Sequence, residues 1–312
     1  MTTRERQTFP LVPRRRLVGI SFGTIPSRRR GHGADVIGSR PYEPGDPVST
    51  IDWFATARLS SAAGHDEFVV RDRAADEAPR VAIVCDRRPA MGIYEPPFPW
   101  LSKGHALVEA TAAIAASAAA AQSDVGAIDF AGADDRGGDP YWLAPGRRHQ
   151  VGEIIDRQSE PGAFDAPEHN VAAAVAFLGR RRKELPPGSF LFVLSDFLVP
   201  VAVEAWLDAR ANGWDVVPVV IQDPTWERSF PEVASVLVPL VDVDSGKTFS
   251  VRMTSREVER RRESNERRHA ELMRLFASLE LDPVAIGSSD PPDIDRAFLE
   301  WAELRRQTRW LR

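Results

Sequence analysis

From residue 80 onward the hydrophobic positions alternate between short, continuous apolar runs and longer helical stretches. The apolar runs predict strands at 81–86, 125–132, 140–146, 189–197 and 214–223. The stretches between them predict helices at 101–122, 171–183 and 201–213. Continuous apolar strands separated by helices are typical of a parallel sheet covered on both faces. This part of the chain is therefore predicted to be a doubly wound, mostly parallel α/β fold.

The segment 233–253 departs from this rhythm. It contains two β-rich runs joined by the turn sequence Asp-Ser-Gly, which predicts an inserted β-hairpin. Thr254 and Glu257 then form the pattern of a capping box, so a helix is predicted from there to about residue 279. The first half of that helix is highly charged, and we expect it to face solvent or a partner. A last strand at 282–287 and a last helix at 293–306 complete the pattern.

Residues 1–79 show a different pattern. Short β-branched runs are punctuated by Gly and Pro, and no helical period of useful length occurs. We therefore predict a β-rich N-terminal segment over 1–79 and a doubly wound domain over 80–312, with the hairpin near 233–253 as its insertion.

Composition narrows the class of protein. The net charge of the 312 residues is −5, so no bulk basic field favours nucleic acid as a partner. The single cysteine, Cys85, lies in an apolar run, which indicates a small buried thiol and a reducing compartment. The start of the chain lacks the apolar core of a signal peptide, and the alanine-rich stretch 110–121 is too short to span a bilayer. We expect a cytoplasmic protein without membrane insertion, and its oligomeric state stays open.

The stretch SRPYEPGDPVSTIDWFATARL (39–59) resembles the signature of a bacterial family known as domain of unknown function 58. The signature residues are Arg40, Tyr42, Pro44, Gly45, Asp46, Asp52, Trp53 and Arg58. We expect Asp46 to accept hydrogen bonds from turn amides and Trp53 to fill a junction with the sheet domain. Arg40, Asp52 and Arg58 could form an ion-pair network. A structural role is favoured for this signature.

A second set of stretches resembles the von Willebrand factor A-like domain of the same family. It comprises VAIVCDRRPAM (81–91), Lys103, SDVGAIDF (123–130) and FVLSDF (192–197). The resemblance covers nearly the whole chain in the right order. It implies a doubly wound sheet, and it implies a MoxR-type AAA+ ATPase as the protein partner.

The same resemblance points to a degenerate metal site. Metal-competent domains of this type end their first strand with the motif D-x-S-x-S, and a Thr and a second Asp from later loops complete the oxygen ligands of a divalent cation. Here Asp86 and Asp196 match the two carboxylates, and Asn170 is the nearest candidate for the Thr. Arg88 and Ala90 stand where the two hydroxyls belong.

Two carboxylates at one edge of a sheet need a positive partner. At ~4 Å and an effective dielectric constant of ~20 they repel each other by ~4 kcal/mol. Arginine offers a fixed charge with paired donors, so we hypothesise that Arg88 or Arg87 replaces the metal as an internal counter-ion. The alternative is that Arg88 points to solvent and Asp86 caps a loop. No cofactor is expected, although weak Mg²⁺ binding through Asp86 and Asp196 stays open.

No motif assembles into a catalytic site. The six histidines are scattered, and there is no G-x-S-x-G elbow, P-loop or C-x-x-C pair. Hydrolysis by Asp86 and Asp196 is disfavoured, because neighbouring arginines would keep both ionised and leave no general acid. The leading interpretation is therefore a non-enzymatic interaction module that binds a MoxR-type ATPase through residues 87–95 and 197–200. A divalent-metal-dependent binder using Asp86 and Asp196 is the main alternative, and a hydrolase using the same pair is a third.

Overall fold

The computed structural model describes residues 7–14, 36–42, 51–63, 68–73, 79–93, 101–132, 138–146, 150–160, 164–241 and 247–310. The chain forms two compact units. One unit contains residues 1–14 together with 80–312, and the other contains residues 15–79. The predicted boundary near residue 80 therefore separates the units, but the first residues of the chain belong with the sheet.

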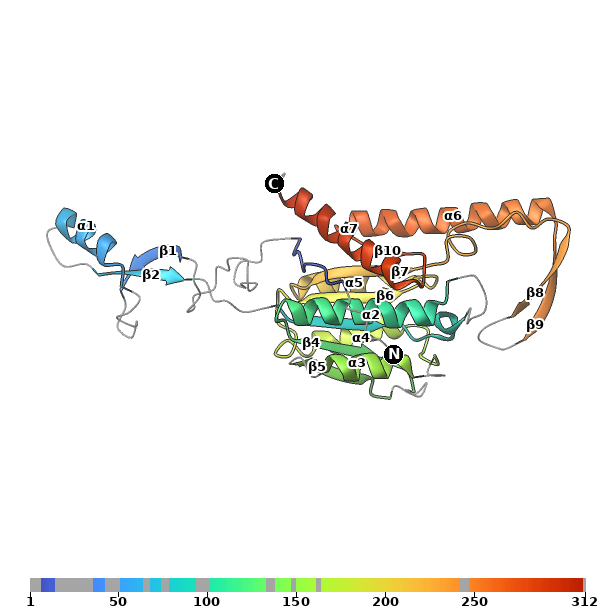
Figure 1. Ribbon diagram of the computed structural model, residues 1–312, viewed down its shortest axis with the longest axis horizontal. Coiled ribbons are helices and arrows are strands. Elements are labelled where there is room, and N and C mark those ends of the chain that lie inside the picture. Colours follow the sequence, from blue (N-terminus) through green and yellow to red (C-terminus); the bar gives the residue numbers. More distant parts are fainter. Residues whose placement is uncertain are drawn as a thin grey trace. The chain divides into compact units, whose positions relative to one another are not determined.

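The larger unit is built on a six-stranded sheet with the order β10-β7-β6-β3-β4-β5. All neighbouring strands are parallel except the pair β4 and β5. Helices flank this sheet (Figure 1), so the predicted doubly wound α/β fold is confirmed. The strands are β3 (Val81–Cys85), β4 (Val125–Asp129), β5 (Tyr141–Gly146), β6 (Phe190–Ser195), β7 (Asp215–Ile221) and β10 (Val284–Ile286).

Strand β5 is an antiparallel edge strand. Residues 130–140, which connect it to β4, are too few for the helical crossover that a parallel pair needs, so the chain turns back on itself. The two strands come very close at Gly126, where an added Cβ would lie 2.3 Å from the carbonyl oxygen of Leu143. Glycine is therefore required at this point of β4.

Helices cover both faces of the sheet. Side chains alternate along β3, so Cys85 lies against Thr111 of α2 while Ala82 and Val84 belong to the core on the other face. The helices α3 (Gln150–Ser159) and α7 (Pro291–Trp310) pack against α2 (Lys103–Ala120). On the other face lie α4 (Asn170–Gly179), α5 (Val203–Ala211) and the apolar end of α6 (Ser255–Ser278). The helix predicted at 171–183 ends at Gly179, and the basic residues 180–183 follow it outside the helix.

The first described residues pack onto this unit. The ring of Phe9 stacks on Phe298 of α7 with centroids 4.6 Å apart, and its backbone N–H donates to Ser117 Oγ of α2 at 3.0 Å. Leu11 and Val12 are buried as well. Residues 9–12 thus pack on the larger unit and not with the rest of the N-terminal segment predicted over 1–79.

The predicted hairpin is present. Strands β8 (Val236–Val241) and β9 (Thr248–Met253) pair in antiparallel fashion. The Asp-Ser-Gly turn lies outside the described residues. Thr254 follows β9 and caps α6, since its Oγ1 accepts from the backbone N–H of Glu257 at 3.2 Å.

The smaller unit combines two antiparallel strands with a helix. The strands are β1 (Val36–Pro41) and β2 (Val69–Arg73), and the helix is α1 (Trp53–Ala63). The prediction of a segment without helix was wrong for 53–63. Asp52 Oδ1 accepts from the backbone N–H groups of Phe54 and Ala55, both at 3.1 Å, and the alanine-rich sequence after this N-cap favours a helix.

Candidate functional site

The two predicted carboxylates come together at the carboxyl edge of the sheet. Strand β3 is the point where the strand order reverses, because β4 lies on one side of it and β6 on the other. Asp86 directly follows β3, and Asp196 directly follows β6. Edges of this kind, at a topological switch point, are where open α/β sheets place their binding sites.

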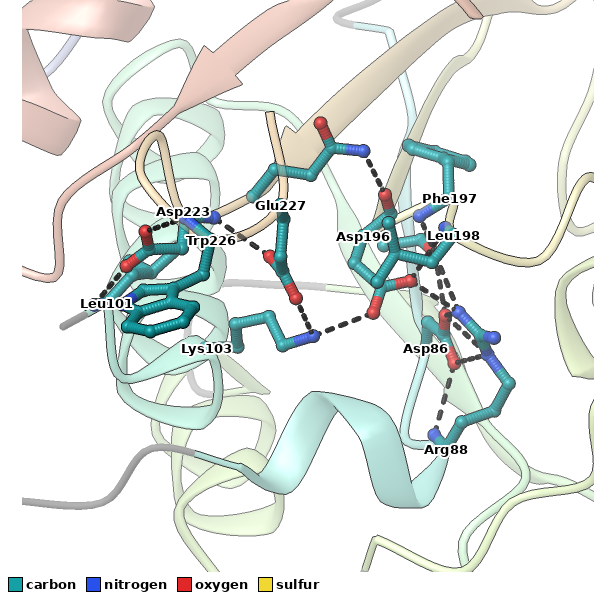
Figure 2. A network of polar contacts seen from close by, with 12 residues as sticks. Asp86, Arg88, Leu101, Lys103, Asp196, Phe197, Leu198, Asp223, Trp226 and Glu227 are labelled. Atoms are coloured by element: carbon teal, nitrogen blue, oxygen red, sulfur yellow. Dashed lines mark hydrogen bonds and ion pairs between the residues drawn. The ribbon is translucent and has the colours of Figure 1, made fainter. Parts of the chain in front are cut away.

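Arg88 lies between the two carboxylates (Figure 2). Its Nη2 is 2.6 Å from Asp86 Oδ2 and 2.7 Å from Asp196 Oδ1. Its Nε donates to both oxygens of Asp86, at 3.0 and 2.9 Å. The Arg88 side chain is only 7% exposed, so the alternative in which it points to solvent is wrong.

Arg87 takes no part in this contact, although the sequence left it as a candidate. Its guanidinium donates to the carbonyl oxygens of Arg157 and Glu160 at 2.8 and 3.1 Å, and it lies over the ring of Phe164. Arg87 therefore caps the end of α3. Consecutive residues of extended chain point in opposite directions, which explains why only one of the two arginines reaches the carboxylates.

A second cation extends the array. Lys103, the first residue of α2, places its Nζ 2.8 Å from Asp196 Oδ2 and 2.8 Å from Glu227 Oε1 (Figure 2). Three carboxylates thus alternate with two cations inside the protein. We refer to Asp86, Arg88, Asp196, Lys103 and Glu227 as the buried charge chain.

The cations decide the protonation of this chain. Burial by itself would raise the pKa of Asp196, but Lys103 and Arg88 outweigh it and hold that pKa below its ordinary value. Burial would lower the pKa of Lys103, yet Asp196 and Glu227 raise it, so the ammonium stays charged. The pKa of Glu227 lies above its ordinary value, because burial raises it and the shared ammonium of Lys103 only partly offsets this.

Neutral groups occupy further positions on the carboxylates. Ser195 Oγ donates to Asp86 Oδ2 at 2.6 Å, and Asn170 Nδ2 donates to Asp86 Oδ1 at 3.0 Å. The backbone N–H of Leu198 donates to Asp196 Oδ1 at 3.0 Å. Every oxygen of the two aspartates therefore accepts at least one hydrogen bond from within the chain.

The residues present do not fit a magnesium ion. Mg²⁺ demands six oxygen ligands in near-ideal octahedral geometry. Here a guanidinium stands between the carboxylates, Ala90 in the short 3₁₀ helix Pro89–Gly92 offers no side-chain oxygen, and Asn170 turns its N–H donor toward Asp86. Within the residues that the structure describes, no group of three or more His, Cys, Asp or Glu side chains is arranged to hold a metal ion.

The N-terminal signature residues lie in the smaller unit. The rings of Tyr42 and Trp53 both meet Phe68 edge-on, at 6.4 and 6.3 Å between centroids, and Trp53 is otherwise exposed. Asp52 is the N-cap of α1, Arg40 lies in β1, and Arg58 is exposed on α1. Pro44, Gly45 and Asp46 lie outside the described residues. The ion-pair network and the contact of Trp53 with the sheet domain stay predictions.

Sequence reasoning missed three members of the site. The family resemblance includes Lys103 without a role, and no sequence pattern assigns a role to Ser195 or Glu227. The only lysine of the alanine-rich helix α2, at its first position, is the one signal in the sequence, since a buried lysine needs an anionic partner. Glu227 comes from a loop far along the chain and carries no local signal.

Cys85 is not part of the site. It is fully buried, and burial, followed by the charge of Asp129, raises the pKa of its thiol to about 12. A thiol in this environment is unreactive.

In the part of the chain that the structure describes, no helix is both long enough and apolar enough to cross a membrane.

These features define a doubly wound α/β domain with a buried, internally neutralised carboxylate pair at its switch point. A family model described as "Protein of unknown function DUF58" matches residues 38–272. The chain belongs to this family, as the signature predicted.

Relatives and solved structures complete the comparison. "Uncharacterized protein Rv1480" of Mycobacterium tuberculosis and "Uncharacterized protein Mb1516" of Mycobacterium bovis are each 28% identical to this chain, over 78% of it and 72% of their own length. The crystal structure of "conserved hypothetical protein BatB" from Bacteroides thetaiotaomicron is 15% identical, with a TM-score of 0.42 over 72% of this chain and all of that one. An "aerotolerance-related membrane protein" from Bacteroides fragilis is 14% identical, with a TM-score of 0.45 over 73% of this chain and all of that one.

Proposed function

We propose that this chain is a non-catalytic protein-binding module of the von Willebrand factor A type and that its partner is a MoxR-type AAA+ ATPase. The observation that carries the proposal is Arg88, whose guanidinium stands between Asp86 and Asp196 where a metal-dependent domain would hold its cation. A built-in counter-ion keeps the edge of the sheet in one shape without a metal. The partner class comes from the family resemblance.

A catalytic role is disfavoured by the same geometry. A carboxylate pair that hydrolyses a substrate needs one protonated member and access to water. The side chains of Asp86 and Asp196 are both fully buried, and the pKa of Asp196 is held low by its two cations. This arrangement disfavours Asp196 as a general acid, and burial keeps both carboxylates away from water.

Apolar side chains next to the site supply a surface for a protein partner. Residues 197–202 leave the end of β6 and lead into α5. Val203 and Leu207, one helical turn apart on α5, are 39% and 49% exposed. Neighbouring exposed apolar side chains are typical of an interaction surface. We take this face of α5 and the preceding segment as the docking edge.

The test uses a purified MoxR-type ATPase encoded in the same genome. Its affinity for the chain is measured by interferometry with ATP and Mg²⁺ present, so that the ATPase itself is loaded. We expect binding to the wild-type chain, and we expect Leu207→Asp to weaken it by about tenfold or more. Leu304→Asp is the matched control, because Leu304 is 59% exposed on α7, and it should bind as the wild type does.

Two results would contradict the proposal. One is the absence of binding by a correctly folded wild-type chain. The other is turnover of generic ester or phosphate substrates that is lost in Asp196→Asn, since this would make the carboxylate pair catalytic.

A further inference from the structure

The backbone of Phe197 has a strained conformation. Its φ is 50°, in the left-handed region that favours glycine, because a Cβ crowds the backbone there. Gln122 and Glu280 also have a positive φ, but they follow the C-caps of helices, where a left-handed residue is common. Phe197 instead follows Asp196 of the buried charge chain. Strained residues persist only where their surroundings hold them, and they are concentrated at binding sites and switches.

Hydrogen bonds to the site hold the turn at Phe197. The backbone N–H of Phe197 donates to Ser195 Oγ at 2.9 Å (Figure 2). The next backbone N–H, that of Leu198, donates to Asp196 Oδ1 at 3.0 Å. The same oxygen of Asp196 accepts from Arg88 Nη2 at 2.7 Å, and the Ser195 hydroxyl itself donates to the charge chain. The two acceptors that hold the turn are therefore fixed by the charge chain.

The ring of Phe197 connects the same turn to two helices. It is buried, and its centroid lies 5.9 Å from that of Trp206 of α5 and 5.5 Å from that of Phe276 of α6. Burial of this large apolar ring offsets the backbone strain. The backbone of Phe197 thus contacts the charge chain, while its side chain contacts the helix that bears the docking edge.

The segment after the turn has few other polar attachments. Residues 199–202 carry no polar side chain, and among the described residues none accepts a hydrogen bond from their backbone N–H groups. Helix α5 begins without a side-chain cap, because an alanine is at its N-cap position. Val201 packs against the core. The hydrogen bond from Leu198 to Asp196 is therefore a main polar contact between the sheet and the docking edge.

We propose that the strained turn at Phe197 couples the buried charge chain to the docking edge. While Ser195 and Asp196 accept its hydrogen bonds, the turn stays left-handed. When an acceptor is lost, Phe197 leaves the left-handed region and residues 198–202 move with it. Coupling of this kind is reciprocal, so a partner that binds the moved segment loosens the charge chain. The use of the docking edge rests on the proposed function, but the coupling is tested on the chain alone, without an ATPase.

The test is amide hydrogen exchange, measured residue by residue by NMR on the full-length chain. Ser195→Ala removes the acceptor of the Phe197 N–H. Ser189→Ala is the matched control, because Ser189 is also buried, directly precedes β6 and donates to the carbonyl oxygen of Pro186. Phe197→Ala and Phe197→Gly separate strain from packing. Both remove the ring, but only alanine keeps the Cβ that disfavours a positive φ.

We expect Ser195→Ala to speed exchange of the Leu198 amide and of the Ala205 amide, which donates to Ala202, by about tenfold. The amides of β6 should keep their wild-type rates, and Ser189→Ala should leave the Leu198 and Ala205 amides unchanged. Added to Phe197→Ala, Ser195→Ala should again speed exchange by about tenfold. Added to Phe197→Gly it should change exchange by less than about twofold, because glycine is not strained there.

Three results would overturn the inference. Ser195→Ala leaves the Leu198 and Ala205 amides at wild-type rates, or it speeds the amides of β6 equally, or the alanine and glycine backgrounds respond alike. The first two results need only the serine variants, so the inference can be refuted even if neither Phe197 variant folds.

Discussion

Two arginines at opposite ends of the same sheet perform the same contact in different surroundings. Arg88 bridges Asp86 and Asp196 at the carboxyl edge. At the other end, where β7 begins, Arg305 of α7 bridges a second pair of aspartates. It lies 3.0 Å from Asp215 and 3.0 Å from Asp282.

The difference lies in how far each pair is closed off from water. The carboxylates of Asp86 and Asp196 are fully buried, and all their partners belong to the charge chain or to its neutral neighbours. Asp282 is 25% exposed and also pairs with the partly exposed guanidinium of Arg14, while Arg305 donates to the carbonyl oxygen of Val12. Arg88 neutralises two carboxylates that are closed off from water, whereas Arg305 binds the start of the chain through the carbonyl group of Val12. The ion pairs of Arg88 and those of Arg305 should therefore contribute different amounts to the free energy of unfolding.

The largest effect is expected from Arg88→Met. This change removes the charge but keeps an apolar stem, and it leaves two buried carboxylates facing each other. Breaking a buried pair in this way costs ~3–5 kcal/mol of unfolding free energy. Urea denaturation followed by circular dichroism measures it. A loss below ~1 kcal/mol would show that the carboxylates find another partner.

The next effect concerns acid stability. A carboxyl group with a lowered pKa in the folded state stabilises the fold above its unfolded pKa, and this stability is lost as pH falls through the folded value. For Asp196 the loss is therefore expected below its ordinary value of 3.8. Melting temperatures of the wild type and Asp196→Asn, measured from about pH 7 to about pH 2, should converge at the acid end. A constant difference over this range would contradict the assignment.

A smaller effect is expected from Arg305→Met. The partly exposed Asp282 can regain water, so only the contacts to Asp215 and Val12 leave buried groups unpaired. We expect a loss of ~1–3 kcal/mol by the same denaturation measurement. A loss as large as that of Arg88→Met would remove the distinction drawn between the two ends of the sheet.

Local patterns predicted more of the fold than of the site. Continuous apolar runs identified the strands, and their carboxyl ends brought Asp86 and Asp196 together because parallel strands share one edge. Arg88 could be proposed because it is two residues from Asp86 and the charge of the pair demanded a cation. The partnership of Lys103 and Glu227 could not be predicted, since it depends on where α2 and a loop after β7 meet in space.

Three other features of the fold were not predicted. The direction of β5 was set by the length of a connection, and the strand pattern does not carry that information. Helix α1 has a local signal in its N-cap, Asp52, but the Gly and Pro residues and the short β-branched runs of 1–79 favour strands and turns. The place of Phe9 depended on Phe298, which is at the other end of the chain.

The central claim is that the guanidinium of Arg88 neutralises Asp86 and Asp196 in place of a metal ion. The melting temperature in the presence and absence of Mg²⁺ or Mn²⁺ tests this claim most directly. We predict no change for the wild type between EDTA and low millimolar metal. In Arg88→Ser, which restores a hydroxyl and removes the cation, added metal should raise the melting temperature, because a ligand that binds only the folded state stabilises it. A metal-dependent rise in the wild type that Asp86→Asn abolishes would contradict the account.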